Sequence, residues 1–128
     1  MALVIVSAKN IKEAYDKSVY RKNKEAYIIE EKGLQDFFFV YKDSFIHYDK
    51  YYKLEPYGTS KIDKSELIYI KDFAESVMNF IEINKELENE SIEKFNVSFS
   101  KVKRYIKKLT KLNQYAIKNS DSLVGLGD

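Results

Sequence analysis

The sequence predicts an α+β fold: a small, mostly antiparallel β-sheet with one early helix, followed by two long C-terminal helices packed as an antiparallel pair. Short apolar runs separated by turn residues fill the first half of the chain, as expected of strands. No Gly or Pro occurs from Thr59 to Val124. Each would cost a helix interior about 1 (Gly) to 3 (Pro) kcal/mol, so their absence favours helix there. Apolar residues in that part recur every three or four positions, which is the helical period.

The chain begins with one expected strand and one expected helix. Leu3–Val6 is an apolar run of the length of a buried strand. Residues 10–13 (Asn-Ile-Lys-Glu) match a capping box, in which the Asn10 side chain accepts an early backbone N–H and Glu13 reaches back. A helix ending near Lys22 would then present one face made by Ile11, Ala14, Tyr15, Ser18 and Val19.

Three further strand regions are expected before the long helices. Their boundaries come from turn residues and from runs of aromatic and β-branched side chains. They are a hairpin of Ala26–Glu31 and Leu34–Tyr41 across Lys32-Gly33, a strand Phe45–Leu54 after the Asp43-Ser44 turn, and a short strand Leu67–Ile70.

Two regular apolar patterns predict the helical pair. A second capping box at residues 72–75 would start an acidic helix whose stripe is Phe73, Val77, Phe80, Asn84 and Leu87. The second pattern is a heptad seam with Asn113 in an a position. Its continuity across residues 96–98 stays open, because Ser98 or Ser100 could cap a new helix. The seam residues are Ile92, Phe95, Phe99, Val102, Ile106, Leu109, Asn113 and Ala116.

The length of 128 residues predicts one domain over residues 1–119, with residues 1–70 mainly sheet plus one helix and residues 71–119 the helical pair. We expect residues 120–128 to be a flexible tail. The apolar run Ala2–Val6 is too short for a signal-peptide core or a membrane span, so we expect a cytoplasmic location and no membrane partner.

Composition argues against most catalytic and cofactor chemistry. The chain has no Cys, and His47 is its only histidine, so thiolate metal sites and Ser/His or Cys/His nucleophile systems lack their residues. Asp43, His47 and Asp49 match no metal-ligand spacing, and the glycines fit no phosphate-binding loop. We therefore expect no enzyme activity, no metal and no cofactor. All basic residues except two are Lys, a bias typical of AT-rich genomes, which suggests a low-GC bacterium or its phages and plasmids.

Two features point toward binding. Nine of the 19 aromatic residues lie within residues 37–57, and tyrosine tolerates half-burial and is enriched at interfaces. From this group we select Tyr48, Tyr51, Tyr52 and Tyr57 as candidate protein-binding residues. The second feature is a set of cations on the outer positions of the seam helix, which form a candidate polyanion-binding stripe: Lys101, Arg104, Lys107, Lys108, Lys111 and Lys118.

The leading hypothesis is a small, non-enzymatic protein-binding module of inhibitor, immunity or adaptor type. One alternative is a nucleic-acid-binding protein that contacts phosphates through the basic helix; lysine is a non-directional charge, so base reading is not expected. A second alternative is a homodimer, or other homo-oligomer, through the heptad seam. The lysines could also be no more than a solvated helix face.

Overall fold

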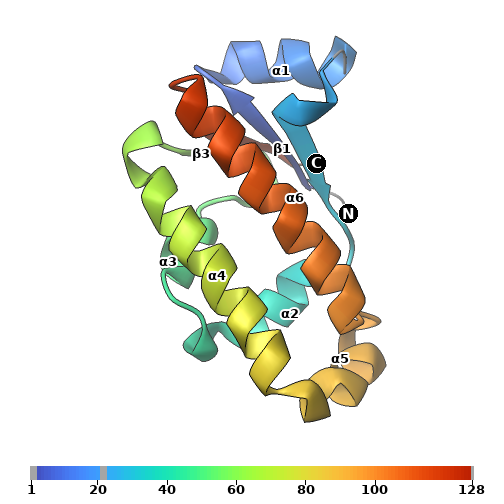
Figure 1. Cartoon of the computed structure of the whole chain (residues 1–128). Coiled ribbons are helices and arrows are strands. Elements are labelled where there is room, and N and C mark those ends of the chain that lie inside the picture. The colour runs from blue at the N-terminus through green and yellow to red at the C-terminus, as the bar shows by residue number, and fades with distance from the viewer. Residues whose placement is uncertain (1–2, 21–22, 128) are drawn as a thin grey trace.

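The computed structural model describes residues 3–20 and 23–127, and it confirms the α+β class. In those ranges one antiparallel sheet has the strand order β2-β1-β4-β3. Figure 1 shows the two longest helices side by side and running in opposite directions, as expected. The strands are β1 (Leu3–Ala8), β2 (Tyr27–Glu30), β3 (Thr59–Ile62) and β4 (Ser122–Leu126). The α-helices are α1 (Ile11–Tyr20), α2 (Leu34–Val40), α3 (Tyr48–Tyr51), α4 (Leu67–Ile83), α5 (Glu88–Phe95) and α6 (Phe99–Lys118).

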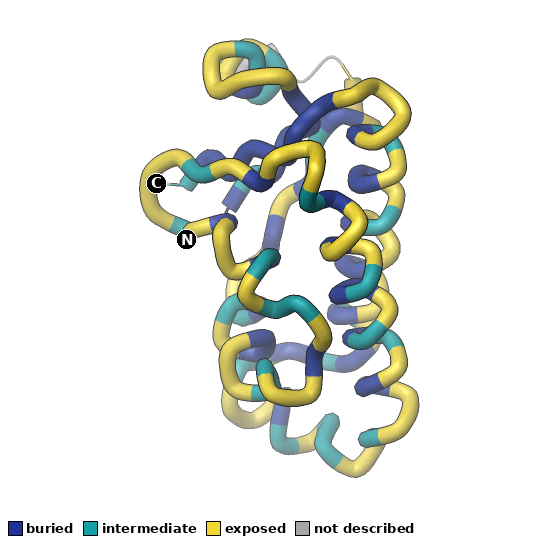
Figure 2. The backbone as a smooth tube through the Cα atoms, turned by 90° about the vertical axis from the view of Figure 1, so that its left-hand side faces the viewer, coloured by how far each residue is buried: buried dark blue, intermediate teal, exposed yellow. Residues whose placement is uncertain are grey.

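The sheet separates two apolar clusters, because successive side chains of a strand point to opposite faces. Ile5 and Leu123 belong to the larger cluster, which also takes in residues of α2 to α6. Val6, Val124 and Ala14 of α1 belong to the smaller one. In Figure 2 the buried backbone follows the strands and the inner sides of the long helices.

The start of the chain largely follows the prediction. The Glu13 N–H donates to Asn10 Oδ1 at 2.8 Å, so Asn10 caps α1. On the expected apolar face Ala14 is buried, whereas Ile11 and Tyr15 are exposed. Lys22, the predicted end of this helix, and the side chain of Val19 lie outside the described residues.

The aromatic segment contains helices where strands were predicted. Leu34–Val40 is α2, and Phe45–Leu54 contains α3, so the second hairpin strand and the strand after it are wrong. Leu34, Phe37 and Phe38 are buried while Phe39 is exposed. Phe37 and Phe38 lie three and four residues after Leu34, and this spacing places the three side chains on one face of the helix.

The acidic helix begins earlier than predicted. Leu67–Ile70 is the first turn of α4 and not a strand, and the proposed capping box at residues 72–75 lies inside the helix. Leu67, Ile70 and Ala74 are all buried, so the apolar stripe of α4 extends to its first residue. A 3-10 turn precedes the first residue of α4, and in it the Ser65 N–H donates to Asp63 Oδ2 at 3.1 Å.

The heptad seam is divided between two helices. Asn96 adopts a left-handed conformation (φ 57°) after α5, and Ser98 caps α6 by accepting the Lys101 N–H at 3.1 Å. Ile92 is 43% exposed and Phe95 is half-buried, while the six seam residues on α6 are buried in the chain's own core. A coiled coil of two chains through this seam would have to open that core.

The predicted flexible tail is wrong for residues 122–126, which form β4. This strand pairs with both β1 and β3, and all five of its residues are buried. Ser120 takes a left-handed conformation (φ 54°), and the Asp121 N–H donates to the Ala116 carbonyl at 2.9 Å, so the chain turns directly from α6 into the sheet.

Candidate functional site

The four candidate tyrosines do not share one surface. Tyr51 is 2% exposed, and its ring stacks on Phe73 with 4.6 Å between ring centroids. Its hydroxyl donates to the Glu30 carboxylate and lies 2.6 Å from the Tyr105 hydroxyl. Tyr51 is therefore a core residue, and its assignment to a binding surface is wrong.

The other three tyrosines line one pocket of about 370 Å³. Tyr48 and Tyr52 come from α3 and the residue after it, and Tyr57 comes from the turn before β3. Tyr52 and Tyr57 are exposed, and Tyr48 is half-buried. Phe39 of α2 adds a fourth aromatic side chain to the lining. The structure thus brings together the exposed part of the aromatic segment in a form suited to holding a ligand or a partner side chain.

Glu30, which also lines this pocket, is 2% exposed. Burial raises the pKa of its carboxyl to about 7, while hydrogen bonds from Tyr51 and Gln35 act in the opposite direction. Burial, with the Glu30 charge beside them, holds the pKa of Tyr51 and Tyr105 well above the usual tyrosine value. Glu30 therefore changes charge near neutral pH, a property that the sequence pattern did not indicate.

The members of the basic stripe on α6 differ in their surroundings. Lys101 is half-buried, donates from Nζ to the Lys32 carbonyl at 2.9 Å, and lies 3.9 Å from Glu31 Oε2. The remaining members are exposed, and none has a carboxylate within ion-pair distance in the described part of the chain; they are Arg104, Lys107, Lys108, Lys111 and Lys118.

Lys108, Lys111 and Lys118 line a groove of about 890 Å³ between α6 and the strand β2, which we call the α6–β2 groove. On one side lie β2 and the turn before it, and on the other side lies α6. Arg104 and Lys107 are not part of the lining. The full lining is Lys24, Glu25, Tyr27, Ile28, Ile29, Glu31, Lys108, Lys111, Leu112, Gln114, Tyr115 and Lys118.

Lys108, Lys111 and Lys118 of this groove belong to the predicted basic stripe, whereas its β2 side was not predicted. Lys24 contributes a fourth cation from a 3-10 turn, far from α6 in the sequence. Glu31 borders both the groove and the tyrosine pocket, so the two features are neighbours on the surface. The sequence did predict a strand at Ala26–Glu31, which contains the β2 side of the groove. Nothing in that segment indicated that the strand would lie at the edge of the sheet beside α6.

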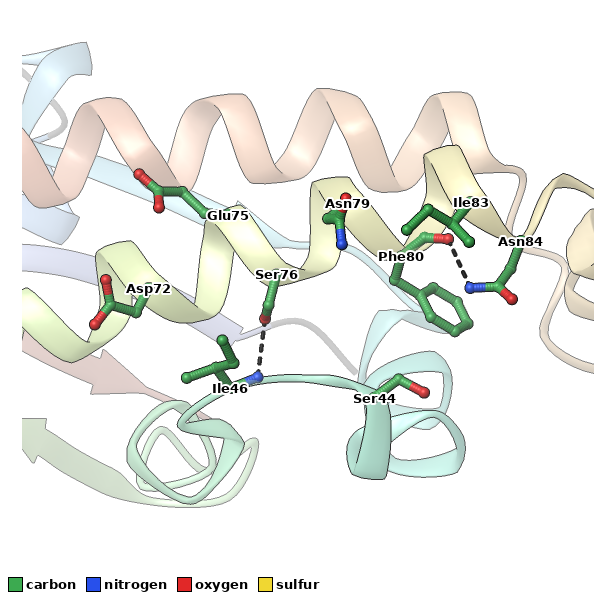
Figure 3. Close-up of a pocket in the computed structure, with 9 residues that line it drawn as sticks. All are labelled: Ser44, Ile46, Asp72, Glu75, Ser76, Asn79, Phe80, Ile83 and Asn84. Carbon is green, nitrogen blue, oxygen red and sulfur yellow. Dashed lines mark hydrogen bonds between the residues drawn. The ribbon is translucent and has the colours of Figure 1, made fainter.

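A third pocket, of about 440 Å³, lies between α4 and residues 44–46 (Figure 3). The Ile46 N–H donates to Ser76 Oγ at 3.0 Å across it, and Asn84 Nδ2 donates to the Phe80 carbonyl at 3.0 Å. None of the predicted site residues lines it. Within the described residues, no group of three or more His, Asp or Glu side chains is arranged to bind a metal ion.

Comparison of the chain with protein-family models, with curated proteins and with solved structures found no match. None of the helices in the described part of the chain combines the length and apolarity needed to cross a membrane. The α6–β2 groove and the tyrosine pocket are the two surface features that contain predicted site residues.

Proposed function

We propose that this protein is a small, non-enzymatic protein-binding module of inhibitor, immunity or adaptor type, acting in the cytoplasm, that holds its partner in the α6–β2 groove. The observation that carries the proposal is the composition of the groove. It combines an outer strand, the exposed apolar side chain of Ile29, and the lysines of α6. Apolar contact with flanking charges is the usual chemistry of a protein interface.

The tyrosine pocket supports the same proposal. Tyr52 and Tyr57 are exposed aromatic residues, and Glu31 places their pocket directly beside the groove. A partner seated in the groove can therefore also contact the rings. Tyrosine is enriched among the residues that contribute most to binding energy.

Affinity purification from the native host, with and without nuclease, tests the proposal. The key variant is Lys108→Glu/Lys111→Glu, because both residues line the groove. Lys103→Glu/Lys107→Glu is the matched control: it has the same charge change on the same helix, at exposed residues outside the groove. We expect a nuclease-resistant partner that the first variant loses and the control retains. The proposal fails if no such partner is captured, or if both variants lose it equally.

Nucleic-acid binding is the second candidate, favoured by the five exposed cations of the basic stripe on α6 that have no carboxylate partner among the described residues. A phosphate backbone would be attracted by all the exposed cations of α6, Lys103 included, so both double variants should weaken binding to a similar degree. Affinity should also fall steeply with salt, with a log–log slope of several units. Absence of DNA and RNA binding at about 50 mM salt would exclude this candidate.

A further inference from the structure

We infer that the tyrosine pocket is a site for a cationic side chain of the partner, an arginine or a lysine, held against aromatic rings and carboxylates. This inference rests on the proposed protein-binding function and makes it more specific. Four observations lead to it: the rings that line the pocket, the carboxylates among them, a cation that the chain itself places on one of the rings, and the position of the pocket beside the α6–β2 groove.

Aromatic side chains from three separate segments line this pocket of about 370 Å³. Phe39 comes from α2, and Tyr57 comes from the turn before β3. Tyr48 and Tyr52 lie between them in the sequence, with 5.6 Å between their ring centroids. Phe39, Tyr52 and Tyr57 are each more than half exposed, so an occupant can reach their rings. The face of an aromatic ring attracts a cation, and a group of such rings is a common binding site for ammonium groups.

The carboxylates of the pocket favour a cation over an anion. Glu30, Glu31 and Asp36 line it, against a single lysine, Lys32. Asp36 is exposed and has no cation within ion-pair distance in the described part of the chain, whereas Glu31 lies 3.9 Å from Lys101 Nζ. Glu30 is buried, so it acts on an occupant through its charge and not through direct contact. An incoming arginine or lysine therefore finds Asp36 as an available carboxylate beside the rings.

The chain already places a cation on one ring of the pocket. Lys42 Nζ lies 4.2 Å from the centroid of the Phe39 ring, within the distance of a cation–π contact. Lys42 itself is not part of the pocket lining. No lysine or arginine of the described residues lies over the rings of Tyr52 or Tyr57. These two rings are therefore the ones on which a cation of the partner would lie.

The position of the pocket favours a side chain of the partner over a free ion. Glu31 lines both the pocket and the α6–β2 groove, so a partner seated in the groove can place a side chain among the rings. The two neighbouring features differ in charge, because four lysines and two glutamates line the groove, whereas three carboxylates and one lysine line the pocket. We therefore expect the partner surface to carry an arginine or lysine beside acidic residues.

NMR titration of the ¹⁵N-labelled full chain, at constant ionic strength, tests this inference with charged and neutral probes of nearly the same shape. The charged probes are N-acetyl-arginine amide and N-acetyl-lysine amide. Their neutral controls are N-acetyl-citrulline amide and the lysine probe acetylated on its side chain. We expect the charged probes to shift the amide resonances of residues 30–36 and 48–57, and to bind at least about threefold more tightly than the neutral ones.

Substitutions of the exposed rings locate the site. Tyr52→Leu and Tyr57→Leu should each weaken binding of the charged probes at least about threefold, because each removes a ring. Tyr52→Phe keeps the ring and should retain binding. Tyr15→Leu is the matched control, because Tyr15 is an exposed tyrosine of α1 that does not line the pocket, and it should also retain binding. In affinity purification, Tyr52→Leu should capture less of the native partner than Tyr52→Phe does.

Equal binding of charged and neutral probes, an equal loss in Tyr52→Leu and Tyr15→Leu, or no shift in the pocket up to about 20 mM probe would overturn the inference. If the native partner is nonetheless captured and lost in Lys108→Glu/Lys111→Glu alone, the proposed function stands and only the cation inference fails. If the charged probes bind but Tyr52→Leu captures the partner as well as the natural chain does, the pocket takes a free cation and not a side chain of the partner. If they bind and no partner is captured, the proposed function fails and the pocket is again a site for a free cation.

Discussion

Glu30 places a carboxyl in the core, where it accepts from the Tyr51 hydroxyl, which in turn contacts the Tyr105 hydroxyl; burial there disfavours the ionised form of the carboxyl. Its pKa is about 7 in the folded protein, against an ordinary value of 4.5. The folded state therefore holds a proton that the unfolded state has already released between these two pH values. Because the folded state binds more protons there, the contribution of Glu30 to the free energy of unfolding falls as pH rises from about 4.5 to 7.

The substitution Glu30→Gln should remove this dependence. A glutamine side chain can still accept from the Tyr51 hydroxyl and carries no charge at any pH. We expect the variant to be more stable than the natural chain at pH 8, by up to about 3 kcal/mol, and nearly equal to it at pH 4. Urea unfolding at both pH values checks this. An equal difference at pH 4 and pH 8 would mean that charge burial is not the cause.

At the residue scale, the sequence could indicate residue type but not which side of a helical turn each residue occupies. Tyr51 and Tyr52 are adjacent and chemically identical, yet one is in the core and the other is exposed. The predicted strand would also have placed these two rings on opposite sides, but it is the packing of α3 that puts Tyr51, and not Tyr52, in the core. The apolar spacing of Phe45, Tyr48 and Tyr51 fits a helix better, but runs of aromatic residues have high β-propensity, and that preference decided the prediction.

At the scale of elements, the sequence predicted long helices well and short ones poorly. The stripe of α6 is long enough to establish the helical period, and all six seam residues on it are buried. In α2, Leu34, Phe37 and Phe38 give the same period over only two turns, too few repeats to outweigh the aromatic run. Tyr105 and Leu112 of α6 are also buried, although the predicted heptad seam did not include them. A straight helix that packs on several neighbours buries a wider stripe than a coiled coil does.

The start of α6 combines a cap with an unfavourable charge distribution. Lys101, Lys103 and Arg104 lie near its N-terminus, where the helix dipole disfavours cations. Two acceptors offset this: Ser98 Oγ receives the Lys101 N–H, and Glu88 Oε2 receives the Phe99 N–H at 2.8 Å. The carboxylate comes from α5, so the break between the two helices supplies the charge that the start of α6 lacks.

We therefore expect Ser98→Ala to lower the free energy of unfolding by about 1 kcal/mol, the usual cost of losing a serine N-cap. Ser100→Ala is the matched control, because Ser100 is exposed and lies inside the helix, where alanine is favoured. Thermal unfolding followed by circular dichroism compares the two. Equal stability of both variants would show that Ser98 does not cap α6 in solution.

At the scale of the whole molecule, the fold depends on pairing between the two ends of the chain. β4 lies between β1 and β3, so residues 122–126 join strands that are far apart in the sequence. Asp121 reinforces this arrangement: it is buried, accepts from Ser7 Oγ at 2.8 Å, and lies 3.1 Å from Lys9 Nζ. The prediction of a flexible tail failed because a five-residue strand with a glycine has no local pattern; its stability comes from partners that sequence order does not reveal.

A chain shortened to end at Asn119 should accordingly not fold. It loses one of the two inner strands, leaves β3 without its described partner and exposes the apolar side chains of β1. Burial of Leu123, Val124 and Leu126 is worth about 1.5–3 kcal/mol for each side chain. Their sum is comparable to the total stability of a typical domain, about 5–15 kcal/mol. Far-UV circular dichroism and hydrogen exchange measure the outcome.

A chain lacking only Asp128 is the control, and we expect it to unfold at nearly the temperature of the full chain.

A milder variant, Gly127→Ala, tests the same end of the sheet, because a Cβ at this position would overlap the backbone of Pro56. The Gly127 N–H also donates to the Gly58 carbonyl at 2.8 Å, so the alanine has to displace the turn before β3. We expect intermediate stability for this variant. Cooperative unfolding of the chain ending at Asn119, within a few degrees of the full chain, would instead show that the helices and the three remaining strands fold without β4.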